Sequence, residues 1–328
     1  MTATGDRVVR ALGPVTVVGA GISGAACAAA LAAAGLRVHV YDRGRGRGGR
    51  LASYAVDGRV VDVGASYFTV SDPRFERQVR DWERRGVARP WTDTFHVAGP
   101  QGITGTSSGP MRWASPLGLR TLAVDLLGEV RVTNPYDVES VAPGPSVDGE
   151  VAEAAVLAMP DPQAADLLAP SLAEELEQLE DRRWEAVVAV SAGWGRRGWL
   201  PELDGVFVND SQVLSWVADD GRRRGDGAPV LVAHSTAAYA EEFLDAPDAA
   251  AEGMVAAVRA LLGVQEEPRW VRVNRWSLAR PAGGREEPYF LGEAMVGLCG
   301  DGWHGRPRVE AAYLSGLELG QAIAERVG

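Results

Sequence analysis

The stretch that decides the fold lies near the start of the chain and reads Val15-Thr-Val-Val-Gly19-Ala-Gly21-Ile-Ser-Gly24. Its β-branched residues favour a short strand, and the small-residue run at 25–34, which Gly35 ends, favours a helix. A second strand is predicted at 37–42. This order of strand, glycine turn, helix and strand predicts one βαβ unit, whose right-handed crossover belongs in a parallel sheet covered on both faces.

The three glycines of this turn have the spacing of a dinucleotide-binding fingerprint. Gly19 permits the tight turn, Gly21 lets backbone amides approach a pyrophosphate, and Gly24 allows the helix to pack closely on the strand. The helix N-terminus then offers unsatisfied N–H groups to the phosphates. Asp42 ends the second strand at about the ~20-residue offset where a carboxylate accepts hydrogen bonds from an adenosine ribose. We therefore predict a bound dinucleotide.

Composition narrows the remaining classes of function. The 328 residues include 44 acidic and 33 basic side chains, and every basic one is arginine, for a net charge of -11. A negative field disfavours nucleic acid and membrane partners, and the absence of lysine excludes Schiff-base chemistry. Cys27 and Cys299 have no Cys or His neighbour at ligand spacing. We therefore expect no metal site, no disulfide framework and a reducing, cytoplasmic compartment.

Beyond residue 160 the pattern changes and predicts a second, mixed-sheet α+β domain. Its predicted strands lie at 186–194, 213–218, 229–234 and 270–278, and its predicted helices at 162–179 and 237–262. Before it, the sequence predicts a hairpin at 56–63, a surface helix at 72–85 and three strands within 129–160. Arg222-Arg-Arg-Gly225 lies between Asp-Gly pairs and is predicted to be an exposed hairpin tip. A strand at 295–299 and a helix at 309–327 follow.

Two further segments distinguish FAD from NAD, because both cofactors use the same βαβ unit. Arg43-Gly-Arg-Gly-Arg-Gly-Gly49-Arg50 directly follows Asp42, and Gly300-Asp301 precedes the helix at 309–327. A carboxylate in a Gly-Asp pair at the end of a strand can reach a ribityl hydroxyl. The helix after it can offer amides to the flavin pyrimidine as that ring gains negative charge. On these elements the sequence resembles the FAD-dependent amine-oxidase superfamily.

Within this superfamily the chain resembles the renalase-like group over nearly its whole length. The residues that carry this resemblance are Asp62-Val-Gly-Ala-Ser-Tyr-Phe68-Thr69, Gly109-Pro-Met111, Arg275-Trp276, Ala279-Arg280-Pro281, and the run from Gly300-Asp301 to Ser315-Gly316. The resemblance implies oxidation of off-isomer dihydronicotinamide dinucleotides, with electrons passed to oxygen to give peroxide. In many amine oxidases of the superfamily a lysine near flavin N5 holds a water, and this chain has no lysine for that place.

The same resemblance implies which residues hold the cofactor. The adenosine and pyrophosphate would be held by Gly19, Gly21, Ser23, Gly24, Asp42, Arg43, Gly49 and Arg50. The flavin would be lined by Gly64, Ala65, Ser66 and Tyr67, and the ribityl and pyrimidine groups would be held by Gly300, Asp301 and Val309. No cysteine lies where a flavin thioether is expected, so FAD is predicted to bind non-covalently.

Three residues are candidates for the reacting face of the flavin: Tyr67, Trp276 and His234. The resemblance brings the strand with Trp276 to the flavin edge, although aromatic side chains fill cores as often as they wall flavin pockets. His234 ends an apolar strand and either faces the site or caps the helix that follows, and the cap is favoured. His304, in the loop after Asp301, is a comparable candidate.

We therefore expect an α/β fold with a discontinuous, Rossmann-like FAD-binding domain at 1–75, 126–162 and 293–328. A mixed-sheet substrate domain is expected at 76–125 and 163–292. The expected activity is that of an FAD-dependent oxidoreductase that takes hydride from a small-molecule, dihydronicotinamide-type donor and passes electrons to molecular oxygen. One alternative is an FAD amine oxidase or desaturase acting on a secondary metabolite. Another is a flavin-binding protein without turnover.

Overall fold

The structure, a computed structural model, describes residues 13–179 and 182–327, so residues 1–12 of the predicted segment 1–75 lie outside it. Its first large sheet has the strand order β17-β18-β11-β1-β2-β7. These strands are β17 (Phe290–Leu291), β18 (Val296–Cys299), β11 (Ala154–Ala158), β1 (Val15–Val18), β2 (Val38–Tyr41) and β7 (Arg131–Thr133). All neighbours are parallel except β17 and β18. Because α1 (Ile22–Ala33) joins β1 to β2, the predicted βαβ unit is confirmed.

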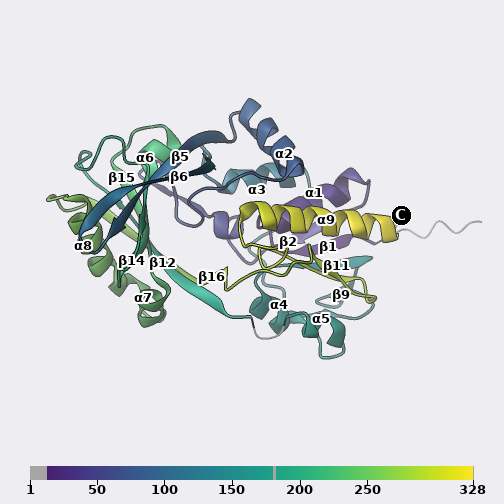
Figure 1. The fold of residues 1–328 in the computed structure, drawn as a ribbon. Coiled ribbons are helices and arrows are strands. Elements are labelled where there is room, and N and C mark those ends of the chain that lie inside the picture. Colours follow the sequence, from purple (N-terminus) through teal and green to yellow (C-terminus); the bar gives the residue numbers. More distant parts are fainter. Residues whose placement is uncertain (1–12, 180–181, 328) are drawn as a thin grey trace, which may run out of the picture.

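The helix α1 is covered by α9 (Val309–Val327), which lies across it in Figure 1. The two helices meet at backbone distance. A Cβ on Gly316 would overlap the carbonyl oxygen of Ser23, and a Cβ on Gly320 would lie 2.7 Å from that of Cys27. Glycine at these two positions therefore allows α9 to close the core around α1.

The helices α2 (Pro73–Arg84) and α3 (Arg120–Leu127) pack on the same core. α2 begins where the side chain of Asp72 accepts a hydrogen bond from the backbone N–H of Arg74, at 2.7 Å. Its Trp82 is fully buried in the hydrophobic cluster that surrounds α1. The predicted surface helix at this place is confirmed. Part of the segment predicted for the second domain thus packs with the first sheet.

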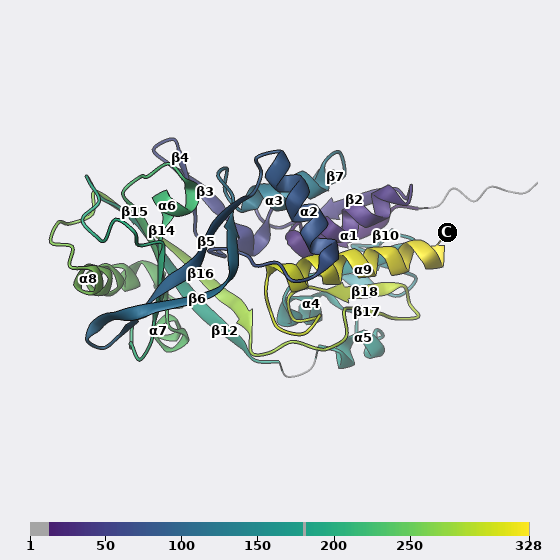
Figure 2. The same cartoon turned by 45° about the horizontal axis from the view of Figure 1, so that its top comes forward.

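The second large sheet has the strand order β16-β12-β15-β14-β13-β5-β6, and among its neighbours only β13 and β5 are parallel. Its strands are β5 (Arg89–Gly99), β6 (Gly102–Ala114), β12 (Trp184–Gly193), β13 (Gly205–Val208), β14 (Leu214–Asp219), β15 (Val230–Ser235) and β16 (Trp270–Pro281). The predicted mixed sheet is therefore confirmed. Figures 1 and 2 show the two sheets as two halves of the molecule, with β12 and β16 reaching from the second half toward the first.

Two predicted helices are each divided, which corrects their boundaries. The segment predicted as 162–179 forms α4 (Asp161–Leu167) and α5 (Ala173–Glu177). The segment predicted as 237–262 forms α7 (Ala237–Glu242), the short 3-10 helix η2 (Pro247–Ala249) and α8 (Ala250–Leu262). Pro170 and Pro247 lie at the breaks, because proline has no backbone N–H and disfavours helical geometry in the residue before it.

The predicted hairpin around Asp57-Gly58 is confirmed by β3 (Ser53–Val56) and β4 (Arg59–Asp62). The three strands predicted within 129–160 become five. Between β7 and β11 the chain forms a small sheet of β8 (Val141–Ala142), β9 (Ser146–Val147) and β10 (Glu150–Val151). Within the described ranges, no helix is long and apolar enough to cross a bilayer.

Candidate functional site

Two of the three glycines at the start of α1 are required by close backbone packing, and the third faces open space. Gly19 has a φ of 110°, and a Cβ there would lie 2.5 Å from the carbonyl oxygen of Ala158. A Cβ on Gly24 would overlap the carbonyl oxygen of Gly19. Gly21 differs, because its φ of -71° suits any residue and its Cβ would meet no atom within 4 Å. The space at Gly21 therefore lies in front of the α1 N-terminus, which has no side-chain cap.

Asp42 and the loop after it close over this turn. The carboxylate of Asp42 accepts hydrogen bonds from the backbone N–H groups of Ala20 and Gly44, both at 2.7 Å. The backbone N–H of Gly48 donates to the carbonyl of Ala20 at 2.8 Å, and Gly48 pairs with Gly21 in a parallel bridge. A carboxylate has about four acceptor positions, so Asp42 keeps capacity for a ribose hydroxyl.

Arg50 and Asp301, predicted from distant segments, meet in the structure. The Arg50 guanidinium donates to both carboxylate oxygens of Asp301, at 2.8 and 2.6 Å, and to the carbonyl of Ala279 at 3.0 Å. It also lies 5.2 Å from the ring centroid of Trp184, at the start of β12. This two-point ion pair fixes the predicted ribityl ligand next to the predicted pyrophosphate ligand.

Residues 62–67, named the 62–67 segment, run beside Arg50. The backbone N–H of Ala65 donates to the carbonyl of Arg50 at 2.9 Å, and a Cβ on Gly64 would overlap that same oxygen. Gly64 is thus required by close backbone packing. Two of the residues predicted to line the flavin therefore lie directly against the loop that carries Arg50.

Two tryptophans of the second sheet hold the 62–67 segment from its other side. The indole N–H of Trp276, on β16, donates to the carbonyl of Val63 at 2.9 Å. The indole N–H of Trp216, on β14, donates to the hydroxyl of Ser66, also at 2.9 Å. Trp276, which the resemblance places at the flavin edge, therefore contacts the segment that the resemblance implies lines the flavin. Trp216 contacts the same segment, although the sequence analysis did not single it out.

Tyr67 ends the segment inside an aromatic cluster of the second sheet. Its ring centroid lies 5.3 Å from that of Phe95, 5.7 Å from that of Trp216 and 6.4 Å from that of Trp91. Burial raises the pKa of the Tyr67 phenol, and the nearby charge of Arg112 opposes this. The Tyr67 side chain is therefore uncharged near neutral pH and partly buried.

The predicted capping role of His234 is wrong. The helix α7 is capped by Thr236, whose hydroxyl accepts the backbone N–H of Tyr239 at 3.2 Å. A threonine hydroxyl directly before the helix is a better cap than an imidazole three residues from the first turn. The Nε2 atom of His234 is buried and has no hydrogen-bond partner among the described residues.

His234 lies near the 62–67 segment, because the backbone of Gly64 acts on its imidazole. Burial, together with the charges of Arg223 and Arg280, lowers the pKa of His234 to about 3, and the backbone of Gly64 opposes this shift. The imidazole is therefore uncharged near neutral pH. Its free Nε2 lone pair can accept a hydrogen bond.

This shift predicts an acid-sensitive contribution to stability. The folded-state pKa of about 3 lies below the ordinary histidine value of 6.5, so the unfolded chain binds the proton first as the pH falls. The free energy of unfolding should therefore fall between about pH 6.5 and about pH 3, and His234→Gln should lose less over the same range. Urea unfolding at a series of pH values measures this. Equal acid sensitivity in the two proteins would contradict the assignment of a neutral, buried imidazole.

The segment 222–225 joins the antiparallel neighbours β14 and β15, so the predicted hairpin connection is confirmed, but the tip is not a simple turn. The chain forms a short helix there, α6 (Asp220–Arg224), which Asp219 caps by accepting the backbone N–H of Arg222 at 2.8 Å. Gly225, at a φ of 88°, ends it. Two of its three arginines are buried, with Arg223 only 1% and Arg224 only 7% exposed. The Asp-Gly pairs correctly indicate a chain reversal, but the arginines point into the protein.

The other predicted cofactor residues lie around the same region. Ser23 is buried in the first turn of α1, Arg43 is exposed, Gly49 has a φ of 52° beside Gly21, Gly300 has a φ of 154° and Val309 begins α9. Sequence reasoning missed Arg120, whose guanidinium lies against Gly46 in the loop that follows Asp42.

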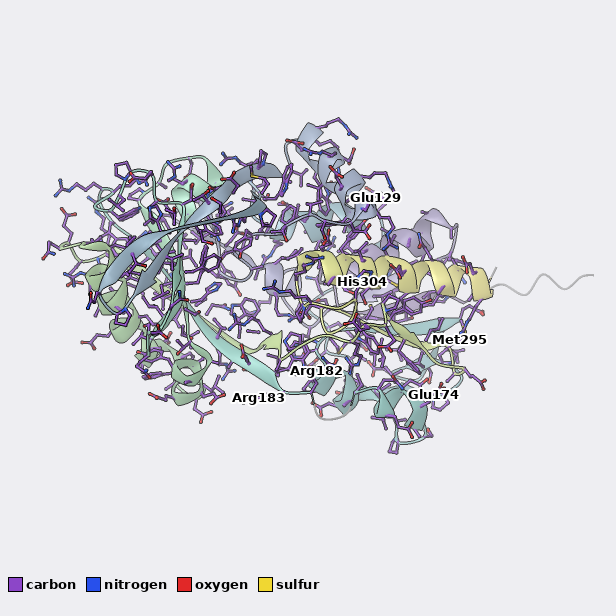
Figure 3. The ribbon with its side chains drawn as sticks, in the orientation of Figure 1. Glu129, Glu174, Arg182, Arg183, Met295 and His304 are labelled. Carbon is purple, nitrogen blue, oxygen red and sulfur yellow. The ribbon has the colours of Figure 1, made fainter. Side chains whose placement is uncertain are left out.

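His304 has a different environment from His234. Figure 3 shows His304 beside the beginning of α9, and its Nε2 lies 3.2 Å from a carboxylate oxygen of Glu318 on that helix.

Cys27 and Cys299 are buried, and burial raises the pKa of the Cys299 thiol to about 12. In the described ranges, no cluster of three or more His, Cys, Asp or Glu side chains suits a metal ion.

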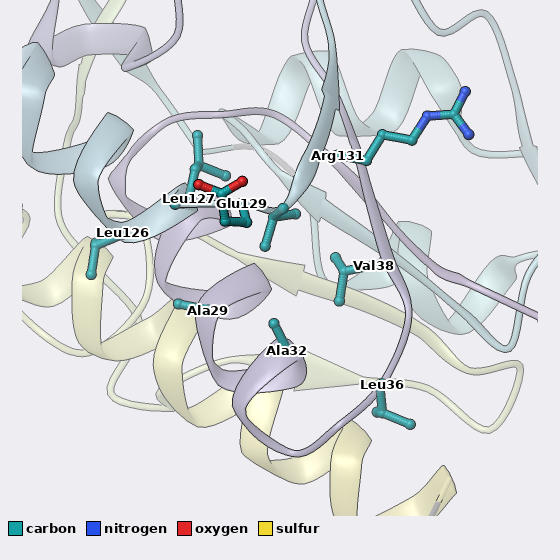
Figure 4. A pocket seen from close by; sticks show the side chains of 10 residues that line it. Ala29, Ala32, Leu36, Val38, Leu126, Leu127, Glu129 and Arg131 are labelled. Atoms are coloured by element: carbon teal, nitrogen blue, oxygen red, sulfur yellow. The ribbon is translucent and has the colours of Figure 1, made fainter.

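A surface hollow of about 430 Å³ lies apart from this site. Figure 4 shows its lining side chains, which include Ala29 and Ala32 from the last turns of α1 and Leu126 at the end of α3. The glycine turn is at the other end of α1. The hollow is therefore separated from the glycine turn by the length of that helix.

Comparison with known proteins identifies the family. Residues 17–82 match the NAD(P)-binding Rossmann-like domain, and residues 129–324, more than half of the chain, match the flavin containing amine oxidoreductases. The chain belongs to the flavin containing amine oxidoreductase family. This family consists of FAD-dependent oxidoreductases, so the predicted cofactor and enzyme class are confirmed at that level.

Solved structures support the fold of this flavin containing amine oxidoreductase. It is similar to a putative protoporphyrinogen oxidase from Exiguobacterium sp. 255-15, with a TM-score of 0.74 and 14% identity over 96% of this chain and 99% of that one. It is also similar to putrescine oxidase bound to putrescine, with a TM-score of 0.72 and 16% identity over the same shares. At these identities the likeness concerns the fold alone.

The residues of this amine oxidoreductase fit FAD. The space in front of Gly21 would hold a pyrophosphate against the α1 N-terminus, and Asp42 keeps acceptor capacity for a ribose. Asp301 would serve the ribityl chain, and the 62–67 segment would lie along the flavin. The unpartnered Nε2 of His234 and the ring of Tyr67 then remain available on the side of the second sheet.

Proposed function

We propose that this flavin containing amine oxidoreductase oxidises a dihydronicotinamide-type donor and passes its electrons to molecular oxygen. The observation that carries the proposal is that the three side chains proposed to face the donor carry no charge near neutral pH. His234 is uncharged near neutral pH, Tyr67 and Trp276 are aromatic, and the chain has no lysine. A dihydropyridine is already a strong hydride donor, so it needs apolar walls and no general base.

Each residue has a defined task in this proposal. Bound FAD supplies hydride acceptance at N5. Tyr67 and Trp276 form walls that orient the flat donor ring and exclude water, and the Nε2 atom of His234 accepts a hydrogen bond from the donor. Asp42, Arg50 and the α1 N-terminus hold the cofactor. In the complete reaction, the donor loses one hydride, which supplies two electrons and one proton, and one oxygen molecule takes these together with a second proton from solvent to become hydrogen peroxide.

Amine oxidation is the second candidate, because the matching family is described as amine oxidoreductases and the fold is similar to that of putrescine oxidase. An amine must be bound as the free base before it gives up hydride. Among the residues proposed to face the donor, the imidazole of His234 is the candidate base, and its pKa of about 3 makes it a weak one. The arrangement therefore favours the dihydronicotinamide donor.

The test is anaerobic reduction of the flavin in the purified protein. We expect 2- or 6-dihydro isomers of NAD(P) to bleach the flavin absorbance within seconds, whereas simple alkyl and aryl amines leave it oxidised. Rapid bleaching by an amine but not by the dihydropyridines would replace this proposal with amine oxidation. A flavin that stays oxidised with every donor would favour a flavin-binding protein without turnover.

A further inference from the structure

A cluster of buried ion pairs joins the short helix α6 to the hairpin strand β4. Asp220 is fully buried and pairs with Arg223 and with Arg59, the latter at 2.5 Å. Arg224 pairs with the buried carboxylate of Asp62 at 3.0 Å. β4 leads directly into the 62–67 segment, whereas α6 belongs to the second sheet. The cluster therefore ties the two halves of the molecule together immediately beside the proposed flavin site.

Arg223 is unlike the other arginines in this cluster, because it contacts the backbone of the 62–67 segment. One guanidinium nitrogen donates to the carbonyl of Ser66 at 3.1 Å, and another donates to the carbonyl of Asp62 at 3.2 Å. Its Nε and Nη2 atoms also donate to the carboxylate of Asp220, which neutralises the buried charge. Arg223 thus holds both ends of a five-residue stretch from the opposite half of the molecule.

The charge balance of the cluster does not require these backbone contacts. Arg59 and Arg224 already approach Asp220, and Arg224 also pairs with Asp62. A planar guanidinium with five fixed N–H directions can bridge a carboxylate and two carbonyls at once, which the point charge of an ammonium cannot. Arg223 therefore differs from the other arginines because its hydrogen bonds fix the position of the backbone in the 62–67 segment.

The stretch that Arg223 spans carries the contacts of the candidate reacting groups. Trp276 donates a hydrogen bond to the carbonyl of Val63, and the backbone of Gly64 lies close enough to His234 to affect its pKa. Both of these contacts lie between the two carbonyls that Arg223 holds. A shift of this backbone would move the two side chains together with the residues expected to line the flavin.

We propose that Arg223 is a positioning residue for the oxidation. It fixes the backbone from Asp62 to Ser66, so that Trp276 and His234 hold the donor at reacting distance from the flavin. This inference rests on the proposed function for the placement of the flavin along the 62–67 segment. It adds a residue from α6 that contacts neither donor nor cofactor.

The test compares Arg223→Lys with Arg222→Lys, since the two arginines are adjacent and both variants keep the charge. Arg222 pairs with Asp204 near the surface and makes no contact with the 62–67 segment. Arg223→Lys should retain FAD but slow anaerobic flavin reduction roughly ten- to a hundredfold, because small misplacements of reacting groups are costly. It should also change the visible circular dichroism of the flavin. Arg222→Lys should match the wild type in both measurements.

A second variant keeps the inference testable if Arg223→Lys does not fold. Trp216→Phe removes the hydrogen bond to the Ser66 hydroxyl together with part of the buried ring, and it should slow reduction in the same direction by a smaller factor. Wild-type reduction rates in the folded variants would overturn the inference. So would weaker FAD binding with an unchanged reduction rate of the bound flavin.

Failure of the proposed function gives a different pattern. If amines rather than dihydropyridines reduce the wild type, the same variants are compared with the amine, and a slower Arg223→Lys still supports the positioning role. If no donor reduces the wild type, the visible circular dichroism of the flavin is compared between the two variants instead. A signal of Arg223→Lys equal to that of Arg222→Lys overturns the inference, and a distinct signal supports it.

Discussion

Gly21→Val should fold like the wild type and purify without flavin. The backbone at Gly21 has a φ of -71°, which any residue adopts, and an added Cβ meets no protein atom within 4 Å. The valine side chain would instead fill the space where the pyrophosphate meets the α1 N-terminus. Loss of two charge-assisted hydrogen bonds at ~1.5–3 kcal/mol each lowers FAD affinity by roughly a hundredfold to ten-thousandfold.

Flavin absorbance per polypeptide and the thermal unfolding midpoint measure this prediction. Gly105→Val is the matched control, because a Cβ there also meets nothing within 4 Å and the position lies on β6, in the other sheet. The control should stay yellow, and acid or heat should release free FAD from it, as from the wild type. Full flavin content in Gly21→Val would mean that the phosphates bind elsewhere.

Asp301→Ala should weaken FAD binding by roughly ten- to a hundredfold, because the carboxylate contributes a hydrogen bond of ~1.5–3 kcal/mol to the ribityl chain. The substitution also frees Arg50 from its two contacts with Asp301, so Asp301→Asn, which keeps an acceptor for Arg50, should lose less. Titration of the apoprotein with FAD, followed by flavin fluorescence, measures both variants.

Asp81→Ala is the control for Asp301. Its carboxylate forms exposed ion pairs with Arg84 and Arg85 on α2, and such pairs contribute ~0–1 kcal/mol. Its FAD affinity should equal that of the wild type. Equal affinity in Asp301→Ala as well would reduce the Gly-Asp pair at 300–301 to a turn without a role in cofactor binding.

The parts of the fold that sequence reasoning predicted are those with local signals. The glycine turn, the acidic end of β2 and the hairpin at Asp57-Gly58 are each specified by neighbouring residues, and each is found where expected. The divided helices show the limit of periodicity, because one proline interrupts a helix even where the surrounding pattern stays helical.

The buried arginines show what local signals do not contain. Arg223 and Arg224 lie in a charged, Asp-Gly-flanked stretch that resembles any surface turn. Their burial depends on Asp62, which lies 162 residues from Arg224 in the sequence and becomes a neighbour only when the second sheet packs on β4. The capping role predicted for His234 is wrong for a local reason, because Thr236 directly before α7 supplies the cap.

The backbone contact between α1 and α9 also sets the order of assembly during synthesis. α1 is among the first elements to leave the ribosome, and α9 leaves it after every other helix and strand of the described residues. Until α9 arrives, the face of α1 around Cys27 has no cover, and the nascent chain carries an exposed apolar surface that chaperones recognise. The start of that helix, beside the glycine turn, is therefore packed against its last neighbour only once α9 has been made.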